Sequence, residues 1–434
     1  MTWKTVEYAG WGRFYRAKGE LARPERASTL DQLVRETPCP AIGRRRSYAD
    51  GCLNTERRAI DTARLDRILS LDEEEGILEV EAGCQLGEIV RHIGPKGWLP
   101  MVLPGTGFAT VGGAIGMDVH GKNHHHAGSF GQHVEAMTLH LPEGRRKVTP
   151  ADPLFKATVG GMGQTGPIGT ARLRMQRTKG PVMMVTERRV PDLDSYLELF
   201  DNSEATYTVG WIDATATGAS LGRGILEEGE TGAGLVPPAK RGRRIPMDAP
   251  HFALSGPIVR GFNATYFRRI PERGRTVVKP LEDFFFPLDK IHEWNRLYGK
   301  RGFHQFQCVV PLSAREVLRD MLKAVGESGL ASPLAVLKRM GPGRGGMMSF
   351  PTDGYTLAID FPARDEAPAM IRRLIAMAVE AGGRVYLAKD AFAQPEQVDA
   401  MYPERETWAE ICNSLDPDGA YATDLVRRLN LRNL

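Results

Sequence analysis

A glycine-rich stretch from Pro104 to Gly131 constrains the fold of this 434-residue chain most strongly. Within it, the segments 104–107 (PGTG) and 111–116 (VGGAIG) set glycines among apolar residues. Such a backbone exposes N–H groups without side chains in the way, which suits a pyrophosphate or a flat ring. The chain holds 48 glycines, so glycine is enriched over the roughly 7% that is usual. From the residues alone, contact with a ligand and a tightly packed turn both stay open.

A second glycine segment, 161–166 (GMGQTG), fits the spacing G-x-G-x-x-G. A dinucleotide fingerprint of that form needs a strand before it and a helix after it. Here Pro167 follows at once, and the alternating pattern over 168–175 then predicts a strand. We therefore interpret the segment as a glycine-rich turn, with a close backbone approach to a phosphate or a ring as the alternative.

The composition excludes several classes of protein. Hydrophobic residues at 42% and charged residues at 25% are typical of globular domains with a large core. A net charge of +4 is too small to indicate nucleic-acid binding. Five cysteines without C-x-x-C spacing favour neither disulfides nor a zinc site. The first 20 residues lack an apolar core and no apolar run reaches 18 residues, so we expect no signal peptide, no membrane span and a cytoplasmic protein.

Periodicity divides the chain into two regions of α+β character. In the first 175 residues we expect short strands and glycine turns, with helices at 28–36 and 85–93 and strands at 40–43, 77–82 and 168–175. Beyond 178–190 the pattern favours an antiparallel sheet with covering helices: strands at 207–212, 303–310 and 356–361, helices at 314–326 and 367–382. The last 45 residues again favour helix, with Trp408, Leu415 and Leu425 in the core.

A histidine cluster lies at the end of the glycine-rich stretch, at positions 120, 124, 125, 126 and 133. The spacing of His120 and His124 would suit a metal if both lay on one helix face. Gly121 and the flanking glycines disfavour a helix there, and no carboxylate or cysteine completes a ligand set. We therefore predict no metal site. His120 is expected to be a hydrogen-bonding group in an active-site loop, and a satisfied structural histidine is the alternative.

Several segments together resemble the vanillyl-alcohol-oxidase (PCMH-type) FAD-linked oxidases, and within them the branch that acts on lipid-linked ribose. The N-terminal ones are 43–50 (GRRRSYAD), 103–107 (LPGTG), 110–115 (TVGGAI), 118–124 (DVHGKNH), 127–131 (AGSFG) and 158–161 (TVGG). Later ones are 287–289 (PLD), 293–295 (EWN), 298–299 (YG), 305–307 (QFQ), 388–390 (AKD), 401–403 (MYP) and 424–429 (DLVRRL). The resemblance covers nearly the whole chain, in order.

The resemblance implies a two-domain α+β fold. Residues 1–178 and 384–434 would form a PCMH-type FAD-binding domain that the C-terminal segment closes. Residues 179–383 would form an inserted α+β substrate domain, built on an antiparallel sheet, which caps the flavin.

The resemblance also implies FAD and the residues that hold it. Tyr48 stands where many relatives attach flavin through a histidine, so the FAD is expected to be non-covalent. Arg45 and Ala49 stand where close relatives carry glycine. The implied cofactor residues are Gly43, Arg46, Ser47, Tyr48, Asp50, Pro104, Gly105, Thr106, Thr110, Gly112, Gly113, Ala114, Ile115, Asp118, His120, Gly121, Asn123, His124, Gly161, Gly166 and Ile168.

Three residues are implied to be catalytic. Lys389 aligns with the family's active-site lysine and would polarise the substrate hydroxyl or the flavin, because a cation stabilises developing negative charge. His120 and Tyr48 would orient the hydroxyl or relay its proton. Without the resemblance, a surface ion pair would be the ordinary interpretation of Lys389.

The implied substrate residues lie in the second region of the chain. Lys338 would bind a phosphate, and Gln305 and Gln307 would share one strand face, where a solvated face is the ordinary alternative. Asn295, Trp211, Phe285 and Ala358 complete the implied lining. Ala358 replaces a cysteine of well-known members, and Phe285 and Thr356 replace polar residues of close relatives.

The implied reaction is oxidation of the 2′-hydroxyl of a polyprenyl-phosphoryl-β-D-ribofuranose to the 2′-keto sugar, the first half of epimerisation to an arabinose donor for cell-wall arabinan or another product. A separate NAD(P)H-dependent short-chain reductase would complete it. An FAD-dependent oxidase of a free sugar or aldonolactone, and a flavin-binding protein with a dead site, are the alternatives. The basic run 240–244 is either a solvated loop or a contact with an anionic membrane, so peripheral membrane attachment and a periplasmic location stay open.

Overall fold

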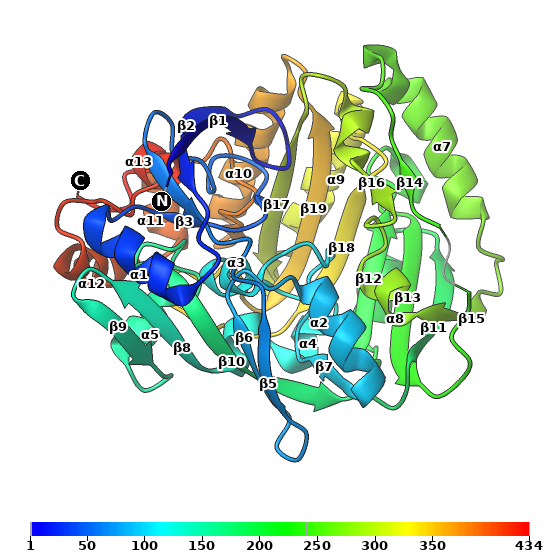
Figure 1. The fold of residues 1–434 in the computed structure, drawn as a ribbon. Coiled ribbons are helices and arrows are strands. Elements are labelled where there is room, and N and C mark those ends of the chain that lie inside the picture. The colour runs from blue at the N-terminus through cyan, green and yellow to red at the C-terminus, as the bar shows by residue number, and fades with distance from the viewer. Residues whose placement is uncertain (1, 239–240, 434) are drawn as a thin grey trace.

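Three large β-sheets and one two-stranded sheet, with helices around them, form the computed structural model, which describes residues 2–238 and 241–433 (Figure 1). The first two sheets come from the N-terminal 177 residues, and the third comes from residues 182–385. The mixed α+β class expected from the sequence is confirmed.

The first sheet has four strands in the order β1-β2-β4-β3. The strands are β1 (Lys4–Ala9), β2 (Arg16–Ala22), β3 (Ala41–Ile42) and β4 (Arg58–Asp61). Helix α1 (Ala27–Glu36) packs Leu30, Leu33 and Val34 into a small core beside this sheet. The chain leaves β3 at Ile42 and runs directly into the loop 43–50, so this sheet fixes where that loop starts.

The second sheet has the order β5-β6-β10-β8-β9, with β7 paired to β10. Its strands are β5 (Ile68–Asp72), β6 (Ile77–Glu81), β7 (Trp98–Pro100), β8 (Val134–Leu141), β9 (Gly144–Val148) and β10 (Ile168–Arg177). The helices among them are α2 (Leu86–Ile93), α3 (Val111–Gly116), α4 (His124–Ala127) and α5 (Pro153–Thr158). Helix α3 is held against the core of this sheet through Val111, Ala114 and Ile115.

The third sheet has eight strands in the order β15-β11-β13-β12-β18-β19-β17-β20, all paired antiparallel. The strands are β11 (Val182–Val190), β12 (Tyr207–Ile212), β13 (Gly224–Gly232), β15 (Arg275–Pro280), β17 (Phe303–Pro311), β18 (Ala335–Met340), β19 (Gly354–Pro362) and β20 (Arg384–Val385). The helices of this region are α6 (Leu193–Asp201), α7 (Gly256–Arg268), α8 (Leu281–Phe285), α9 (Arg315–Ser328) and α10 (Ala367–Glu380). In Figure 1, α7 runs along the outer edge of the molecule.

The C-terminal helices return to the N-terminal part of the chain. They are α11 (Pro395–Met401), α12 (Arg405–Leu415) and α13 (Asp424–Arg428). Trp408 and Leu425 are fully buried, as predicted, and the Trp408 indole N–H donates to Ala157 O at 3.1 Å. Leu415 is only half-buried. The C-terminal segment is therefore an integral part of the core.

The sheets change between β10, which ends at Arg177, and β11, which begins at Val182. Because the sheets change here, we propose that residues 1–178 and 384–434 form one domain and that residues 179–383 form the second. The second proposed boundary coincides with β20, which still pairs with β17 of the large sheet.

The stretch 228–250, which lacks apolar periodicity, is partly a strand. Strand β13 extends to Gly232 because ion pairs and hydrogen bonds satisfy its polar face: Glu228 accepts from Ser203 at 2.6 Å, and Glu230 from the Thr206 amide at 2.6 Å. Further on, β14 (Arg243–Arg244) pairs with β16 (Ile291–His292). Lys240 lies outside the described residues. Among those described, no helix is long and apolar enough to cross a membrane.

Candidate active site

One cavity of about 770 Å³ lies where loops of the first two sheets face the eight-stranded sheet. The loops contribute residues 41–48, 103–106, 108–110 and 119–122 to its wall. Strands β12, β17, β18 and β19 contribute the opposite wall, and residues 386, 388 and 389 close it. Both halves of the chain therefore build a single site.

The loop after β3 forms one end of the cavity. The amides of residues 44–47 make no hydrogen bond within the described part of the chain. Arg45 has a left-handed backbone with φ 53°, so the loop keeps a glycine-like path at the position where the resemblance expects glycine. Successive free N–H groups around a left-handed residue form a concavity that binds anions.

Arg46 adds a buried positive charge to this end. Its guanidinium lies 4.3 Å from the Trp11 ring centre and 5.0 Å from that of Phe108. Within the described residues, its one side-chain hydrogen bond goes to Arg44 O at 3.2 Å, and its Nε atom is buried without a partner. Burial lowers the pKa of Arg46 to about 10, although Asp289 opposes this. A cation without a carboxylate at hydrogen-bonding distance suits an anionic ligand.

The glycine loop before α3 supplies the adjoining wall. Thr110 caps α3 by accepting from the Gly113 amide at 3.2 Å, and Asp289 accepts from the Gly107 amide at 2.7 Å. A side chain at Gly105 would meet no atom within 4 Å. Gly105 thus borders open space and is not a packed turn, which favours the ligand interpretation of this segment.

Lys389 and Tyr48 meet where the loop after β3 reaches the segment 386–389 of the cavity wall. The Lys389 Nζ atom lies 3.4 Å from the Tyr48 ring centre, and the Tyr48 amide donates to Ala388 O at 3.0 Å. Burial lowers the pKa of Lys389 to about 7, with Asp360 opposing and Lys338 adding to the shift. Burial also raises the pKa of the Tyr48 hydroxyl well above its ordinary value, so this phenol stays protonated.

His120 lies between Lys338 and Gln307. The Lys338 Nζ atom is 3.2 Å from His120 Nδ1, and the Gln307 amide group is 2.9 Å from His120 Nε2. Burial and the neighbouring Lys338 hold the pKa of His120 well below its ordinary value, so the ring is neutral. When Lys338 donates to Nδ1, the proton sits on Nε2 and Gln307 must present its carbonyl oxygen there.

Asp360, which the sequence analysis did not single out, lies behind this cluster. It is fully buried on β19 and accepts hydrogen bonds from Gln305 at 2.5 Å and from the Tyr298 hydroxyl at 3.0 Å. Burial raises its pKa to about 7. Asp360 is the one charged residue in this buried strand, and that was the signal that could have revealed it.

Lys122 is a second lining residue that was not singled out. Its ammonium donates to Phe284 O and lies 3.9 Å from the Phe284 ring centre. Burial lowers its pKa to about 8. Lys122 also lowers the pKa of Lys338, to about 7, together with burial. The two lysines therefore place a doubly basic wall in the cavity.

Most of the candidate residues reach the cavity wall. Those that do are Gly43, Arg46, Ser47, Tyr48, Pro104, Gly105, Thr106, Thr110, Gly112, Gly113, His120, Gly121, Gly166, Ile168, Trp211, Gln305, Gln307, Lys338, Ala358 and Lys389. The two glutamines lie on one face of β17, as their spacing predicts. Ala358 stands in register with Gln307 of β17 and Val336 of β18.

The other candidates lie behind the wall: Asp50, Ala114, Ile115, Asp118, Asn123, His124, Gly161, Asn295 and Phe285. Packing and backbone contacts occupy them. Asp118 accepts from Ser129 at 2.8 Å, Asn295 donates to Trp11 O at 3.1 Å, and Phe285 packs edge-on against Tyr207 in the core. These residues support the loops and do not face the cavity.

His120 and His124 do not share a helix face, because α4 begins only at His124. The His124 ring accepts from the Gly341 amide at 3.1 Å. In the described parts of the chain, no group of three or more His, Cys, Asp or Glu side chains could hold a metal.

Comparison with known proteins identifies the relatives of this chain. Residues 24–150 match the FAD binding domain family. The chain is 39% identical to decaprenylphosphoryl-β-D-ribose oxidase of Mycolicibacterium smegmatis over 409 residues, which cover 90% of this chain and 89% of that protein. It is 33% identical to an uncharacterized protein of Streptomyces coelicolor over 80% of this chain and 99% of that protein. Similarity to a D-lactate dehydrogenase of Anaerostipes hadrus, at 27%, covers 29% of this chain and 27% of that protein.

Proposed function

Because the chain belongs to the decaprenylphosphoryl-β-D-ribose oxidase family of FAD-linked oxidases, we propose that it oxidises the 2′-hydroxyl of a polyprenyl-phosphoryl-β-D-ribofuranose to the 2′-keto sugar. One observation carries this proposal. A single cavity joins an anion cradle, built from the free amides 44–47 and Arg46, to a cluster of Lys389, His120 and Lys338.

The described residues fit FAD. The amides of 44–47, the Arg46 guanidinium and the open backbone at Gly105 would hold its diphosphate, and the segment 162–168 would line the adenine side. When bound, FAD supplies the acceptor for the hydride that leaves the sugar carbon. With Tyr48 in the first loop, we propose that the FAD is non-covalent, so acid denaturation should release all of it into the supernatant.

His120 and Lys389 would move and stabilise charge on the substrate hydroxyl. His120 is neutral, so its ring nitrogen is able to accept the hydroxyl proton. Protonated Lys389 would stabilise the negative charge that develops on the oxygen as the proton leaves. Tyr48 keeps its proton and would orient the hydroxyl as a hydrogen-bond donor.

Lys338 and Lys122 would bind the substrate phosphate. Both side chains line the cavity, Lys122 buried and Lys338 half-buried, and neither has a carboxylate partner at ion-pair distance among the described residues. A phosphate dianion between them would restore their charged forms. It would also compete with His120 Nδ1 for Lys338, and this frees the ring nitrogen that accepts the proton.

The lipid chain would leave the cavity along α7. Tyr266 of this helix lines the cavity, whereas Ile258 and Phe262 are 47% and 51% exposed. Arg260 and Arg268 are exposed on the same helix. Apolar and basic side chains together suit an anionic membrane surface. We include this peripheral contact in the proposal, together with an NAD(P)H-dependent reductase that consumes the keto sugar.

A product assay tests the proposed activity. The holoenzyme is incubated with polyprenyl-phosphoryl ribofuranose and a dye as electron acceptor, and the product is reduced with borodeuteride. We expect one deuterium at C2 of a mixture of ribose and arabinose, and no label with Lys389→Met. Deuterium elsewhere, or labelling only with free sugars or lactones, would refute the proposal.

A further inference from the structure

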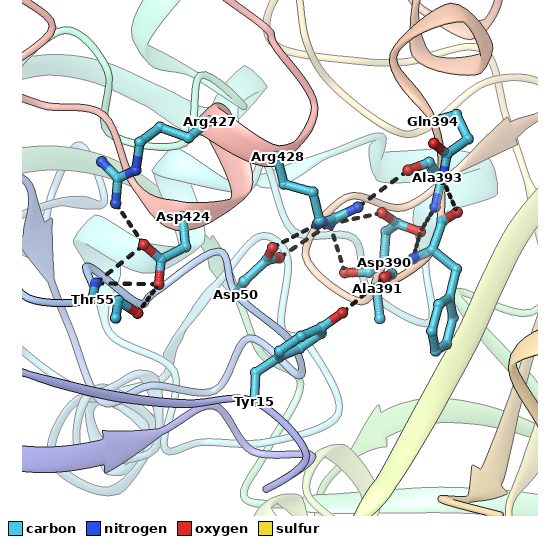
Figure 2. A network of polar contacts seen from close by, with 11 residues as sticks. Tyr15, Asp50, Thr55, Asp390, Ala391, Ala393, Gln394, Asp424, Arg427 and Arg428 are labelled. Carbon is cyan, nitrogen blue, oxygen red and sulfur yellow. Dashed lines mark hydrogen bonds and ion pairs between the residues drawn. The ribbon is translucent and has the colours of Figure 1, made fainter. Parts of the chain in front are cut away.

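Arg428 of the C-terminal helix α13 joins the two loops that carry Tyr48 and Lys389. Its Nε atom donates to Asp50 Oδ2 at 2.6 Å, and Nη2 donates to Asp50 Oδ1 at 3.1 Å and to Asp390 Oδ2 at 3.0 Å (Figure 2). Asp50 follows Tyr48 by two residues, and Asp390 directly follows Lys389. The Arg428 guanidinium therefore links the loop that carries Tyr48 to the loop that carries Lys389.

The two carboxylates depend unequally on this guanidinium. Both are buried, with Asp50 4% and Asp390 3% exposed. Asp390 also accepts from the Phe392 and Ala393 amides, at 3.1 and 2.9 Å. Burial raises the pKa of Asp50, and Arg428 is the strongest influence that lowers it. Without Arg428, the buried Asp50 carboxylate would have no cationic partner and would lie near a second carboxylate, Asp390. Repulsion between the two would favour separation of the loops.

Further contacts shape the loop that carries Lys389. Arg428 Nη1 donates to Ala393 O at 3.2 Å, and the Tyr15 hydroxyl donates to Ala391 O at 3.3 Å (Figure 2). The stack of Lys389 on the Tyr48 ring, at 3.4 Å, forms only when both loops hold these positions. The Tyr48 amide joins the same loops directly by donating to Ala388 O at 3.0 Å, and Arg428, which does not line the cavity, adds the carboxylate bridge between them.

Helix α13 has anchors that are independent of Arg428. Asp424 accepts from the Thr55 hydroxyl at 2.6 Å, and Arg427 donates to Asn54 at 2.7 Å (Figure 2 shows the former). Leu425 and Val426 are fully buried. Replacing Arg428 should therefore leave the helix docked and disturb mainly the two loops.

We propose that Arg428 is a positioning residue that sets the geometry of Lys389 against Tyr48 through Asp50 and Asp390, an inference that rests on the proposed function for its kinetic consequence. Tyr48 and Lys389 line the cavity that would hold the flavin, so the visible spectrum of the bound flavin would report on their relative position without any substrate.

The test compares Arg428→Gln and Arg428→Lys with a matched control. Arg223 pairs with buried Asp213 at 2.8 Å, and its side chain is 24% exposed, as that of Arg428 is. For Arg428→Gln holoenzyme we expect kcat to fall about 100-fold, as an ångström-scale misplacement does, with KM little changed. The flavin absorbance and circular dichroism should shift, and Arg428→Lys should recover part of both. Arg223→Gln should lower Tm and leave kcat and the flavin spectrum as in the wild type.

A double variant separates positioning from stability. Asp50→Asn in the Arg428→Gln background removes the unpaired carboxylate, so Tm should rise toward the wild-type value while kcat stays low. Recovery of kcat together with Tm would overturn the proposal, as would an Arg428→Gln holoenzyme with wild-type kcat and flavin spectrum. If the wild type fails to oxidise lipid-linked ribose, the proposed activity falls. In that case, we compare the flavin spectrum and the rate of FAD release of Arg428→Gln with those of Arg223→Gln. This comparison still decides the role of Arg428.

Discussion

At the scale of single residues, the pKa of Lys389 links the site to pH. Asp360 raises this pKa, and burial lowers it to about 7. If protonated Lys389 is the active form, kcat/KM falls as pH rises through this value. Asp360→Asn removes the stabilising negative charge, so Lys389 loses its proton at lower pH. We predict that the basic limb of the kcat/KM profile moves to lower pH in this variant. A limb that stays in place or moves upward would contradict this.

Lys338 gives a second prediction at this scale. Lys338→Met removes the proposed cationic partner of the substrate phosphate, and we expect a loss of about 2 kcal/mol, or about a 30-fold rise in KM. The KM of a ribofuranoside without a phosphate should change little in the same variant, and it serves as the control. Equal losses for both substrates would place the phosphate elsewhere.

At the scale of elements, substitutions at two glycines distinguish an effect on cofactor binding from an effect on packing. A side chain at Gly105 meets no atom within 4 Å, whereas one at Gly161 would lie 1.9 Å from Ala157 O. We predict that Gly105→Val leaves the Tm of the apoprotein unchanged but weakens FAD binding about tenfold or more, because the valine occupies the cofactor's space. Gly161→Ala should instead lower the Tm of the apoprotein. Thermal scans and flavin titration check both, and the reverse pattern would contradict the assigned cradle.

Helix α7 carries the prediction on membrane contact. Ile258→Asp with Phe262→Asp should abolish sedimentation with anionic phospholipid vesicles. Leu69→Asp is the control. Leu69 is 47% exposed, as Ile258 is, but it lies on strand β5 and not on α7. If the wild type, the double variant and Leu69→Asp bound the vesicles equally, the proposed membrane contact of α7 would be wrong.

The elements show which features could be predicted from the sequence. The strand 207–212 has the predicted bounds, and the helix at 314–326 is found at Arg315–Ser328, because apolar periodicity dominates both. Strand β13 was not predicted, since its second half carries Glu228 and Glu230, which are satisfied by partners distant in sequence. The cavity-lining glycines followed from local sequence and the resemblance.

At the scale of the whole molecule, the site depends on contacts between distant segments. Gln307 meets His120 across 187 residues, and Arg428 meets Asp50 across 378. No local pattern indicates such pairs, so the role of Arg428 emerged only from the fold. The residues of the anion cradle and those of the lysine-histidine cluster come from different sheets, which explains why one cavity needs nearly the whole chain.

The central claim is that this one cavity oxidises a lipid-linked ribose with FAD. The most direct test is the anaerobic visible spectrum of the purified holoenzyme after addition of stoichiometric polyprenyl-phosphoryl ribofuranose. We expect the visible absorption band of the oxidised flavin to bleach in the wild type and to persist in Lys389→Met. Bleaching by free ribose or a lactone but not by the lipid-linked sugar would contradict it.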